Sequence, residues 1–550
     1  MSSLYQKFCK VSFDENGVLN KFEPVCPDNF NFSYDVVDEM ARIAPEQRAM
    51  IWCNDKGEEH IYSFKDMSEY SSKTANYFSD LGIGKGDTVL VILKRHYQFW
   101  FTILALHKLG AVIVPATNLL TEKDIVYRCD MAQIKAVVCS GEDAVANHVE
   151  TAEPKLKAPI IKISAMGSRD GWDDFDAGVE AASAEFARRE NSKDDDMLLY
   201  FSSGTTGYPK MVMHSYTYPI GHIITGSFWH DVKDTDIHLT VAETGWGKAV
   251  WGKLYGQWLA GATVFVYDFD KFTPKDLLEK IEKYHITTFC APPTIYRFFI
   301  KEGMEGYDLS SLRYATTAGE ALNPEVYNRF FEYTGLRLME GFGQTETTLA
   351  LFNAPGTTPK PGSMGKPSPL YDVRLVDEDY NPVAPGQVGE ITIYPNNTGN
   401  VGLFKRYHLN PESTEAAWAG GIYHTGDTAW MDEDGYYWYV GRTDDVIKAS
   451  GYRIGPFEIE SVLMEHPAVL ECAVTGAPDP VRGQVVKATI VLMKGYEGSD
   501  ELVKELQNYV KKQTAPYKYP RIVEFVNELP KTISGKIRRV EIRNQDKSKA

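Results

Sequence analysis

The order of hydrophobic and polar residues along the chain predicts alternating helices and strands. Apolar positions recur with helical spacing at 64–81, VLVIL at 89–93 predicts a buried strand, and a helix-like segment at 97–109 leads into AVIVPA. Further short apolar runs predict strands at 136–140, 159–164, 237–242 and 263–269. Strands that alternate with helices are typical of a largely parallel, layered α/β core.

The pattern changes near residue 440. DEDGYYWYV at 432–440 predicts a hairpin turn around Asp434 and Gly435. The later spacing predicts a helix at 456–465, strands at 469–475 and 485–493, a helix at 500–513 and a strand at 522–526. We therefore predict an α/β protein with a large N-terminal domain of layered α/β subdomains at 1–440, a hinge at 441–445 and a small α+β domain at 446–550.

Length and charge narrow the classes of function. A chain of 550 residues is too long for one hydrophobic core. Its net charge of −17 argues against nucleic acid or an anionic membrane as a main partner. Polyanionic substrates would have to be held by a few local cations.

The cysteines and the apolar runs bear on location. The 7 cysteines are scattered without a CxxC pair, which indicates a reducing compartment. The first ten residues are polar and mixed, so we expect no signal peptide. The most apolar run, 99–116, is interrupted by His107, Lys108 and Gly110, which favours a core helix over a membrane span. These observations predict a cytoplasmic protein.

A glycine- and hydroxyl-rich segment, YFSSGTTGYPK at 200–210, has the composition of a phosphate-binding loop. Gly204 and Gly207 let the backbone approach a phosphate, and Lys210 adds a positive charge. Hydroxyl donors come from Ser202, Ser203, Thr205 and Thr206. The common P-loop has a different glycine spacing, with the lysine directly after the second glycine. An ordinary polar turn after a strand is the alternative.

Further motifs follow in order: TTAGEAL (316–322), GFGQTET (341–347), YHTGD (423–427), GRTDDVIKASGYRIGPFEIE (441–460) and PKTISGKIRR (530–539). With the glycine-rich segment, they resemble the core motifs of the adenylate-forming superfamily, which includes acyl-CoA synthetases, peptide-synthetase adenylation domains and luciferases. Within it, AETGWGKAVWGKLYGQW (242–258), VRGQVVKA (481–488) and APYKYPR (515–521) are similar to the medium-chain acyl-CoA synthetase branch.

The resemblance implies an ATP-dependent ligase with two half-reactions. A carboxylate attacks the α-phosphate of ATP to give acyl-AMP and pyrophosphate, and the thiol of CoA then displaces AMP. Catalysis of this kind depends on positioning and charge stabilisation. Two alternatives remain: an enzyme that loads the acyl group onto a carrier protein in trans, and a non-catalytic nucleotide or acyl-group binder.

The resemblance also implies roles for residues at the ATP site. Lys536 would bridge the carboxylate oxygen and the α-phosphate, Thr345 would bind that phosphate, and Glu346 would hold Mg²⁺. Asp427 would accept the ribose hydroxyls, supported by Arg442. The rest of the implied nucleotide site comprises Gly319, Glu320 and Ala321 around adenine, Gly341, Phe342, Gly343 and Gln344, and Arg453 near phosphate.

Each of these residues has a simpler explanation. Lys536 could be a solvated lysine in a basic tail, and Glu346 an acid at a helix N-terminus. Asp427 could form a turn, and Arg442 a surface ion pair. Phe342 stands where the family usually has tyrosine, which puts any contact through that hydroxyl in doubt.

The remaining implied sites concern the hinge, CoA and the acid. Asp444 matches the hinge about which the small domain swings. The expected CoA contacts are Ser450, Gly451 and Tyr452 at the pantetheine tunnel, and Arg482, Tyr517, Lys518 and Tyr519 at the nucleotide, although ordinary surface cations are the alternative.

The acyl pocket is expected at Trp246, Lys248 and Trp251, with Ala318 as its floor. Two large rings suggest a short- to medium-chain, branched or aromatic acid, while core packing of the tryptophans is an equal alternative. Acetylation of Lys536 would remove its charge, so modifying enzymes are possible partners.

Overall fold

The first sheet contains most of the strands predicted in the N-terminal third of the chain. The computed structural model describes residues 4–202, 209–449, 452–480, 482–532 and 536–549. In spatial order this sheet consists of β21 (Arg406–Tyr407), β11 (Lys210–Ser215), β10 (Asp196–Ser202), β6 (Val112–Pro115), β5 (Thr88–Ile92), β7 (Ile134–Ser140), β8 (Ile161–Ala165) and β9 (Asp173–Asp174). Strands β10, β6, β5, β7, β8 and β9 pair in parallel, and β10 pairs with β11 antiparallel.

The second sheet is parallel in one half and antiparallel in the other. Its order is β19 (Asp372–Val376), β20 (Val388–Tyr394), β22 (Tyr423–Met431), β23 (Tyr437–Arg442), β18 (Ser363–Pro367), β17 (Leu349–Phe352), β16 (Leu338–Gly343), β15 (Tyr314–Thr317), β14 (Thr288–Ala291), β12 (Ile237–Thr240), β13 (Thr263–Asp268), β3 (Arg48–Asn54) and β4 (Glu59–Ser63). The parallel half runs from β3 to β16, and β17 begins the antiparallel half.

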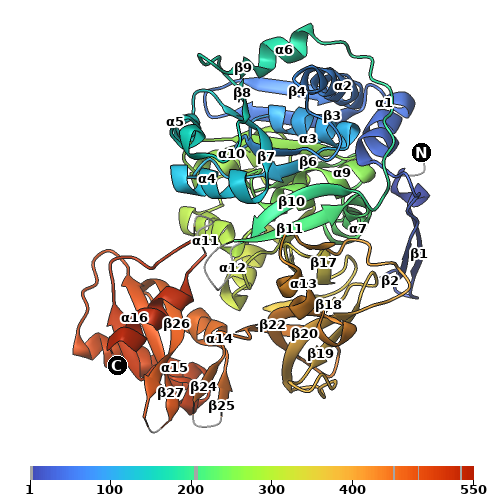
Figure 1. The fold of residues 1–550 in the computed structure, drawn as a ribbon. Helices are drawn as coiled ribbons and strands as arrows, with labels where there is room; N and C mark the ends of the chain where they lie inside the picture. The colour runs from blue at the N-terminus through green and yellow to red at the C-terminus, as the bar shows by residue number, and fades with distance from the viewer. Residues whose placement is uncertain (1–3, 203–208, 450–451, 481, 533–535, 550) are drawn as a thin grey trace.

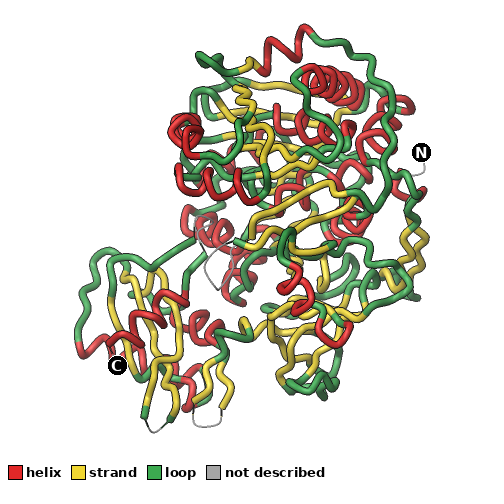
Figure 2. The backbone as a smooth tube through the Cα atoms, in the orientation of Figure 1, coloured by secondary structure: helices red, strands yellow, loops and turns green. Residues whose placement is uncertain are grey.

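Helices connect and cover these sheets (Figures 1 and 2). They are α1 (Glu39–Ile43), α2 (Phe64–Asp80), α3 (Gln98–Leu109), α4 (Glu122–Met131), α5 (Ala144–Ala152), α6 (Phe175–Ala181), α7 (Tyr218–Ile223), α8 (Gly247–Lys253), α9 (Tyr255–Leu259), α10 (Pro274–Lys283), α11 (Pro293–Glu302), α12 (Pro324–Thr334) and α13 (Pro411–Ala417). A separate hairpin pairs β1 (Cys9–Phe13) with β2 (Leu19–Pro24).

Helix α3 is the core helix predicted from the most apolar run. All of its residues are buried, and it ends at Gly110, whose φ of +73° is the left-handed conformation that glycine adopts readily. The chain then enters β6, as the sequence predicts. Across the described residues, every helix is too short or too polar to cross a bilayer.

The elements after residue 446 lie together at the lower left of Figure 1, coloured orange to red. They are β24 (Ile447–Ala449), β25 (Tyr452–Ile454), α14 (Pro456–Met464), β26 (Val469–Asp479), β27 (Gly483–Leu492), α15 (Asp500–Gln513), β28 (Ile522–Phe525) and α16 (Arg539–Lys549). Ser499 caps α15 by accepting a hydrogen bond from the Leu502 amide at 3.2 Å. Leu502, Leu506 and Val510 are buried on one face of α15, as their spacing predicts. The domain boundary at 441–445 stays a prediction.

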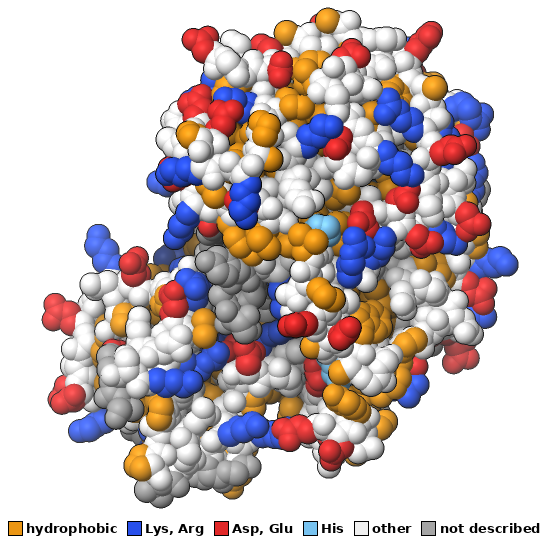
Figure 3. Space-filling view, in the orientation of Figure 1, with side chains coloured by type: hydrophobic (Ala, Val, Ile, Leu, Met, Phe, Trp, Pro, Cys, Tyr) orange, Lys and Arg blue, Asp and Glu red, His pale blue; other side chains and the backbone are white. Residues whose placement is uncertain are grey.

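Charges of both signs cover the surface. Figure 3 shows basic and acidic side chains interspersed over one face of the molecule. Many of them pair, as Arg406 does with Asp196 and Lys360 with Asp432. Exposed pairs of this kind contribute little to stability individually. Because cations are distributed among the acidic side chains, the net negative charge is compatible with a local cluster of cations at a binding site.

A buried histidine joins the two large sheets. His96 follows β5, and its Nδ1 lies 2.6 Å from Asp268 Oδ2 at the end of β13. On its other side, Nε2 lies 3.8 Å from Asp143 Oδ2 at the start of α5. Burial lowers the pKa of His96, but the two carboxylates raise it more, to about 9 from 6.5. The imidazolium is therefore an ionic link between the sheets near neutral pH.

We expect His96→Gln to destabilise the protein most at low pH. Because the folded pKa is raised, this stabilisation is complete below pH 6.5 and is lost as pH rises through about 9. At full strength it contributes at most on the order of 3 kcal/mol. Urea midpoints of the parent and the variant should thus differ at about pH 6 and converge near about pH 10. His60→Gln, on an exposed site, is the control, and a gap that is constant with pH would contradict the assignment.

Candidate active site

The glycine-rich segment begins and ends on two paired antiparallel strands. Strand β10 ends at Ser202 and β11 begins at Lys210, and these two residues are paired in register. Ser203, Gly204, Thr205, Thr206 and Gly207 lie outside the described residues. The two described ends of the segment, Ser202 and Lys210, therefore lie side by side.

Lys210 and Glu346 both contact the side chain of Tyr407. Lys210 Nζ lies 4.6 Å from the centre of the Tyr407 ring, and the Tyr407 hydroxyl donates to Glu346 Oε1 at 2.9 Å. Tyr407 belongs to β21, which pairs with β11. Sequence motifs gave no signal for Tyr407, because 61 residues separate it from Glu346. The arrangement holds a cation and a carboxylate within reach of one phosphate chain.

The turn after β16 is fixed by a buried histidine. His214 of β11 donates from Nε2 to the Thr345 carbonyl at 2.7 Å. Burial lowers the pKa of His214 to about 3, so the ring is neutral and can carry the proton on Nε2. The Phe404 amide donates to the Glu346 carbonyl at 2.8 Å. These contacts hold Thr345 and Glu346 next to the β10–β11 hairpin.

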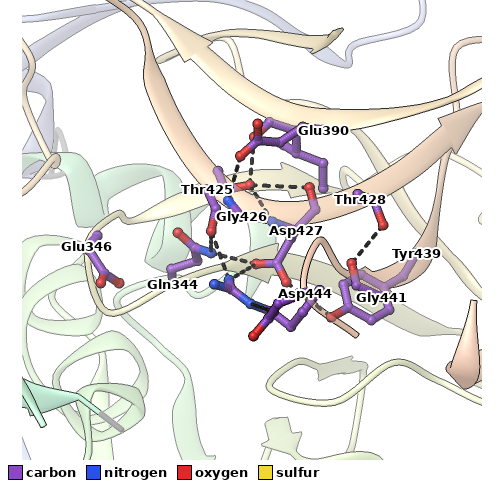
Figure 4. Close-up of polar contacts among 12 residues, drawn as sticks. Gln344, Glu346, Glu390, Thr425, Gly426, Asp427, Thr428, Tyr439, Gly441 and Asp444 are labelled. Carbon is purple, nitrogen blue, oxygen red and sulfur yellow. Dashed lines mark hydrogen bonds and ion pairs between the residues drawn. The ribbon is translucent and has the colours of Figure 1, made fainter. Parts of the chain in front are cut away.

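Asp427 lies at the centre of a polar network between β22 and β23 (Figure 4). The Tyr439 hydroxyl donates to its Oδ1 at 3.1 Å, and Arg442 Nη1 lies 3.3 Å from its Oδ2. Gln344 also donates to Oδ2 and in turn accepts a hydrogen bond from Tyr423 at 2.7 Å. Tyr423 opens the YHTGD motif but was given no role from the sequence, and Tyr439 lies outside the motifs. The network links the GFGQTET, YHTGD and GRTDD motifs in one place.

Lys536 lies close enough to this network for its charge to act on Asp427. Burial raises the pKa of Asp427, while Arg442, Gln344, Tyr439 and the charge of Lys536 act in the opposite direction. The Lys536 backbone is fixed by the Thr532 amide, which donates to its carbonyl at 2.7 Å. Its side chain is exposed. An exposed ammonium within electrostatic range of a buried carboxylate is free to bind an anion placed between them.

Residues 319–321 form a bend that follows β15. Gly319 has φ of +102°, a conformation that favours glycine. Glu320 is exposed and accepts a hydrogen bond from Thr294 at 2.8 Å, and Ala321 is half-buried. Phe342 of β16 is also half-buried. Strands β15 and β16 are neighbours, so the bend and Phe342 lie at the same end of the parallel half-sheet, where ligands of such sheets bind.

The expected acyl-pocket residues are in contact with the nucleotide motifs. Lys248 Nζ donates to the Ala318 carbonyl at 2.7 Å, and burial lowers the pKa of Lys248. Trp251 is 8% exposed and donates from Nε1 to the Tyr218 hydroxyl at 3.0 Å. A Cβ on Gly343 would lie 2.3 Å from the Trp251 ring, so this position has no room for a side chain. Trp246 is half-buried just before α8.

A pocket on the C-terminal sheet contains several of the expected CoA contacts. It is lined by Ala449, Tyr452, Arg482, Val485, Val486, Tyr517, Tyr519 and Arg521. The rings of Tyr452 and Tyr517 stack with their centroids 4.1 Å apart. Arg521, which the sequence did not single out, donates to the Tyr519 hydroxyl at 2.8 Å. Stacked rings beside guanidinium groups suit a phosphorylated nucleotide.

Other expected contacts lie elsewhere. Lys518 Nζ pairs with Glu458 at 2.6 Å and is not part of the pocket lining. Arg453 donates to Glu378 at 2.7 Å and is not part of the Asp427 network. Ser450 and Gly451 lie outside the described residues. Asp444 is beside the network, with Oδ1 3.9 Å from Arg442 Nε.

Curated relatives resemble the chain over nearly its whole length. The acyl-coenzyme A synthetase ACSM4, mitochondrial, of Homo sapiens is 43% identical over 98% of this chain and 95% of its own length. ACSM3, mitochondrial, of Homo sapiens is 42% identical over 94% and 90%.

The predicted cytoplasmic location is contradicted by these relatives, whose names describe them as mitochondrial. The seven thiols are free, and all but Cys26 are buried. Scattered thiols are typical of reducing compartments in general, so they could not separate the two locations.

Solved structures share the fold. An anthranilate CoA ligase, AuaEII, in complex with anthranoyl-AMP has a TM-score of 0.86 and 28% identity, covering 95% of this chain and 98% of its own. A benzoate CoA ligase from Burkholderia xenovorans LB400 has a TM-score of 0.81 and 27% identity, covering 94% and 100%. These likenesses confirm the predicted α/β fold with a small C-terminal part.

Two family models match the chain in succession. The AMP-binding enzyme model matches residues 37–408, and the AMP-binding enzyme C-terminal domain model matches residues 458–536. The first match covers β10, β11, β16 and Glu346, and the second ends at Lys536. The chain therefore belongs to the AMP-binding enzyme family and, within it, to the AMP-forming acyl-CoA synthetases.

Proposed function

We propose that one pocket carries out both half-reactions of this synthetase, first forming acyl-AMP and then the CoA thioester. The observation that carries the proposal is the convergence of Asp427 of β22, Glu346 of the turn after β16 and Lys210 of β11, with the charge of Lys536 acting on Asp427. Two of these groups are cations and two are carboxylates. ATP needs this mixture, because its ribose is bound by acceptors and its phosphates by cations and a metal ion.

In the first half-reaction, Lys536 stabilises the charge that develops as the substrate carboxylate attacks the α-phosphate. Its ammonium binds both the attacking oxygen and a phosphate oxygen, while Thr345 donates to the same phosphate. Asp427 accepts the ribose hydroxyls, and the charge of Arg442 opposes the rise that burial causes in the pKa of that carboxylate. An activated serine or cysteine is not required, because the chemistry depends on alignment of two bound reactants.

The residues present fit a Mg²⁺ ion bound together with ATP. Across the described residues there is no cluster of acids, histidines and cysteines able to hold a metal without a substrate. Glu346 offers one carboxylate beside the phosphate-binding hairpin, which suits an ion that takes most of its ligands from water and phosphate. When bound, Mg²⁺ would neutralise phosphate charge.

In the second half-reaction, the small domain turns about the hinge at 441–445, with Asp444 as the pivot. Lys536 leaves the pocket, and the face with Tyr452, Tyr517 and Arg482 brings CoA to the acyl-AMP. The Thr443 amide donates to the Gly426 carbonyl at 2.9 Å, which supports placing the pivot after Thr443. A pivot needs only a residue that can absorb a change in φ and ψ.

The substrate is a short- to medium-chain, branched or aromatic acid. Lys248 is hydrogen-bonded to the Ala318 carbonyl, and Trp251, which is hydrogen-bonded to the Tyr218 hydroxyl, is a large ring close by in sequence; both support a short acid. Two structural relatives act on anthranilate and benzoate, as their names say. Acetylation of Lys536 would remove the charge that the first half-reaction needs and leave the second intact.

A pyrophosphate-release screen tests this function. The protein, ATP and Mg²⁺ are incubated with straight, branched and aromatic acids of about 2 to 12 carbons. Pyrophosphate and AMP should appear, with turnover dependent on CoA. If a carrier protein replaces CoA as the better acceptor, the enzyme is a carrier-loading one. Tight ATP binding without pyrophosphate from any acid would contradict catalysis.

We expect Tyr407→Phe to lower kcat/KM for ATP by about tenfold, because a hydrogen bond to a charged group contributes ~1.5 kcal/mol. Glu346 then loses the hydroxyl that fixes it, while the ring under Lys210 remains. Steady-state kinetics with ATP varied would measure this loss. Tyr436→Phe is the control, since that hydroxyl donates only to the Thr358 carbonyl at the surface. Equal values for both variants would remove Tyr407 from the site.

A further inference from the structure

Asp445, directly after the pivot, is held by a buried ionic network with the C-terminal helix. Its Oδ1 pairs with the Arg543 guanidinium, and Arg539 Nη1 lies 3.7 Å from its Oδ2. Arg539 also contacts both carboxylate oxygens of Glu460 on α14, at 2.8 and 2.7 Å. The side chains of Asp445 and Glu460 are only 9% and 10% exposed. Buried charges interact more strongly than surface pairs, and each depends on its partner.

The chain on the other side of Asp444 is anchored to a different part of the molecule. The Thr443 amide donates to the Gly426 carbonyl at 2.9 Å, and Arg442 donates to the Thr425 carbonyl at 2.8 Å. Both acceptors belong to β22 of the second sheet. Asp444 therefore lies between an anchor on β22 and an anchor on α16.

We propose that Asp445, Arg539 and Arg543, named here the ionic clamp, are positioning residues for Lys536. The proposal rests on the proposed function, in which the turn at Asp444 brings Lys536 to the ATP pocket. Arg539 is the first residue of α16 and follows Lys536 by three positions. The ionic clamp thus fixes the loop that carries the ammonium relative to the pivot.

The CoA face is attached to the pivot by another route. Strand β24 begins at Ile447, two residues after Asp445, and pairs with β25 and β27 through backbone hydrogen bonds. These strands carry Tyr452 and border the CoA pocket. Loss of the ionic clamp therefore displaces Lys536 but leaves the CoA face in place, so the two half-reactions should respond differently.

The experiment compares Asp445→Asn and Arg543→Gln in the full-length enzyme. The adenylation kcat should fall by ~10- to 100-fold with KM for ATP nearly unchanged, because a small misplacement of a reacting group has effects of that size. Thioester formation from synthetic acyl-AMP should change by less than about threefold. Arg543→Lys, which keeps the charge, should recover part of the adenylation rate.

Asp546→Asn is the matched control. Asp546 lies on the same helix and pairs with Lys487 at 2.5 Å, and these side chains are 9% and 5% exposed. The substitution removes one carboxylate from an equally buried ion pair, leaves Lys487 its second partner, Glu524, at 2.6 Å, and does not touch the pivot. If Asp546→Asn slows adenylation as much as Asp445→Asn does, the ionic clamp is only structural and the proposal fails. Equal loss in both half-reactions, or none in adenylation, overturns it too.

Hydrogen exchange separates this proposal from the proposed function. The amides of Asp445 and Val446 donate to the Arg442 carbonyl at 3.0 and 3.1 Å. They should exchange faster in the variants of the ionic clamp and at the parent rate in Asp546→Asn. If the parent releases no pyrophosphate with any acid, the proposed function fails, and unchanged exchange would separately refute the ionic clamp.

Discussion

Replacing Lys536 with alanine should slow adenylation by ~10²- to 10³-fold, the loss found when one charge-stabilising donor is removed from a transition state. The ammonium binds the α-phosphate only as negative charge builds up, so kcat should fall more than KM for ATP rises. Isotope exchange between pyrophosphate and ATP measures this step directly. The same variant should convert supplied acyl-AMP and CoA to thioester at close to the parent rate.

Lys531→Ala is the control for this experiment. Lys531 bridges to Ile537 in the same turn, and its ammonium pairs with Glu471 at 2.7 Å. Its loss removes one positive charge from the same loop but none from the pocket. If Lys536→Ala and Lys531→Ala exchange pyrophosphate at the same rate, the proposed mechanism is wrong.

Asp444→Pro should reduce thioester formation by ~100-fold while adenylation changes by only a fewfold, because misplaced reacting groups cost about that much. The proline ring fixes φ near −65° and so prevents the rotation that the second half-reaction requires. Single-turnover assays that start from acid and ATP, and separately from acyl-AMP and CoA, would separate the two steps.

Asp444→Ala tests whether the effect comes from the backbone. It removes the same carboxylate, including its approach to Arg442 at 3.9 Å, but leaves φ free. We expect both half-reactions to persist in this variant. A matching loss of thioester formation in Asp444→Ala would mean that the carboxylate matters and that rotation about this residue does not.

The local pattern of hydrophobic residues was sufficient to predict the elements that are buried on all sides or on one regular face. The run before Gly110 became α3, and the spacing of Leu502, Leu506 and Val510 became the buried face of α15. The antiparallel half of the second sheet was not predicted beyond the turn before β23. Its strands pair across long stretches of sequence, as Ser363 does with Trp438, so local sequence does not show which segments are partners.

The candidate site also contains some residues that the sequence could identify and others that it could not. Motif residues such as Asp427 and Glu346 could be named because they lie in short runs with a characteristic order. The tyrosines that hold them could not, since Tyr407 and Tyr439 act through contacts that only the fold creates. Composition also failed for location, because scattered thiols do not distinguish one reducing compartment from another.

The contact between the Trp251 ring and Gly343 has a practical consequence for redesign. The same indole belongs to the proposed acid pocket and packs against Gly343, directly before the turn that leads to Thr345 and Glu346. Replacing Trp251 with a smaller residue to admit bulkier acids would therefore also weaken the packing behind the turn that binds the triphosphate. In a series of engineered variants, those that accept a wider range of acids should therefore bind ATP less tightly.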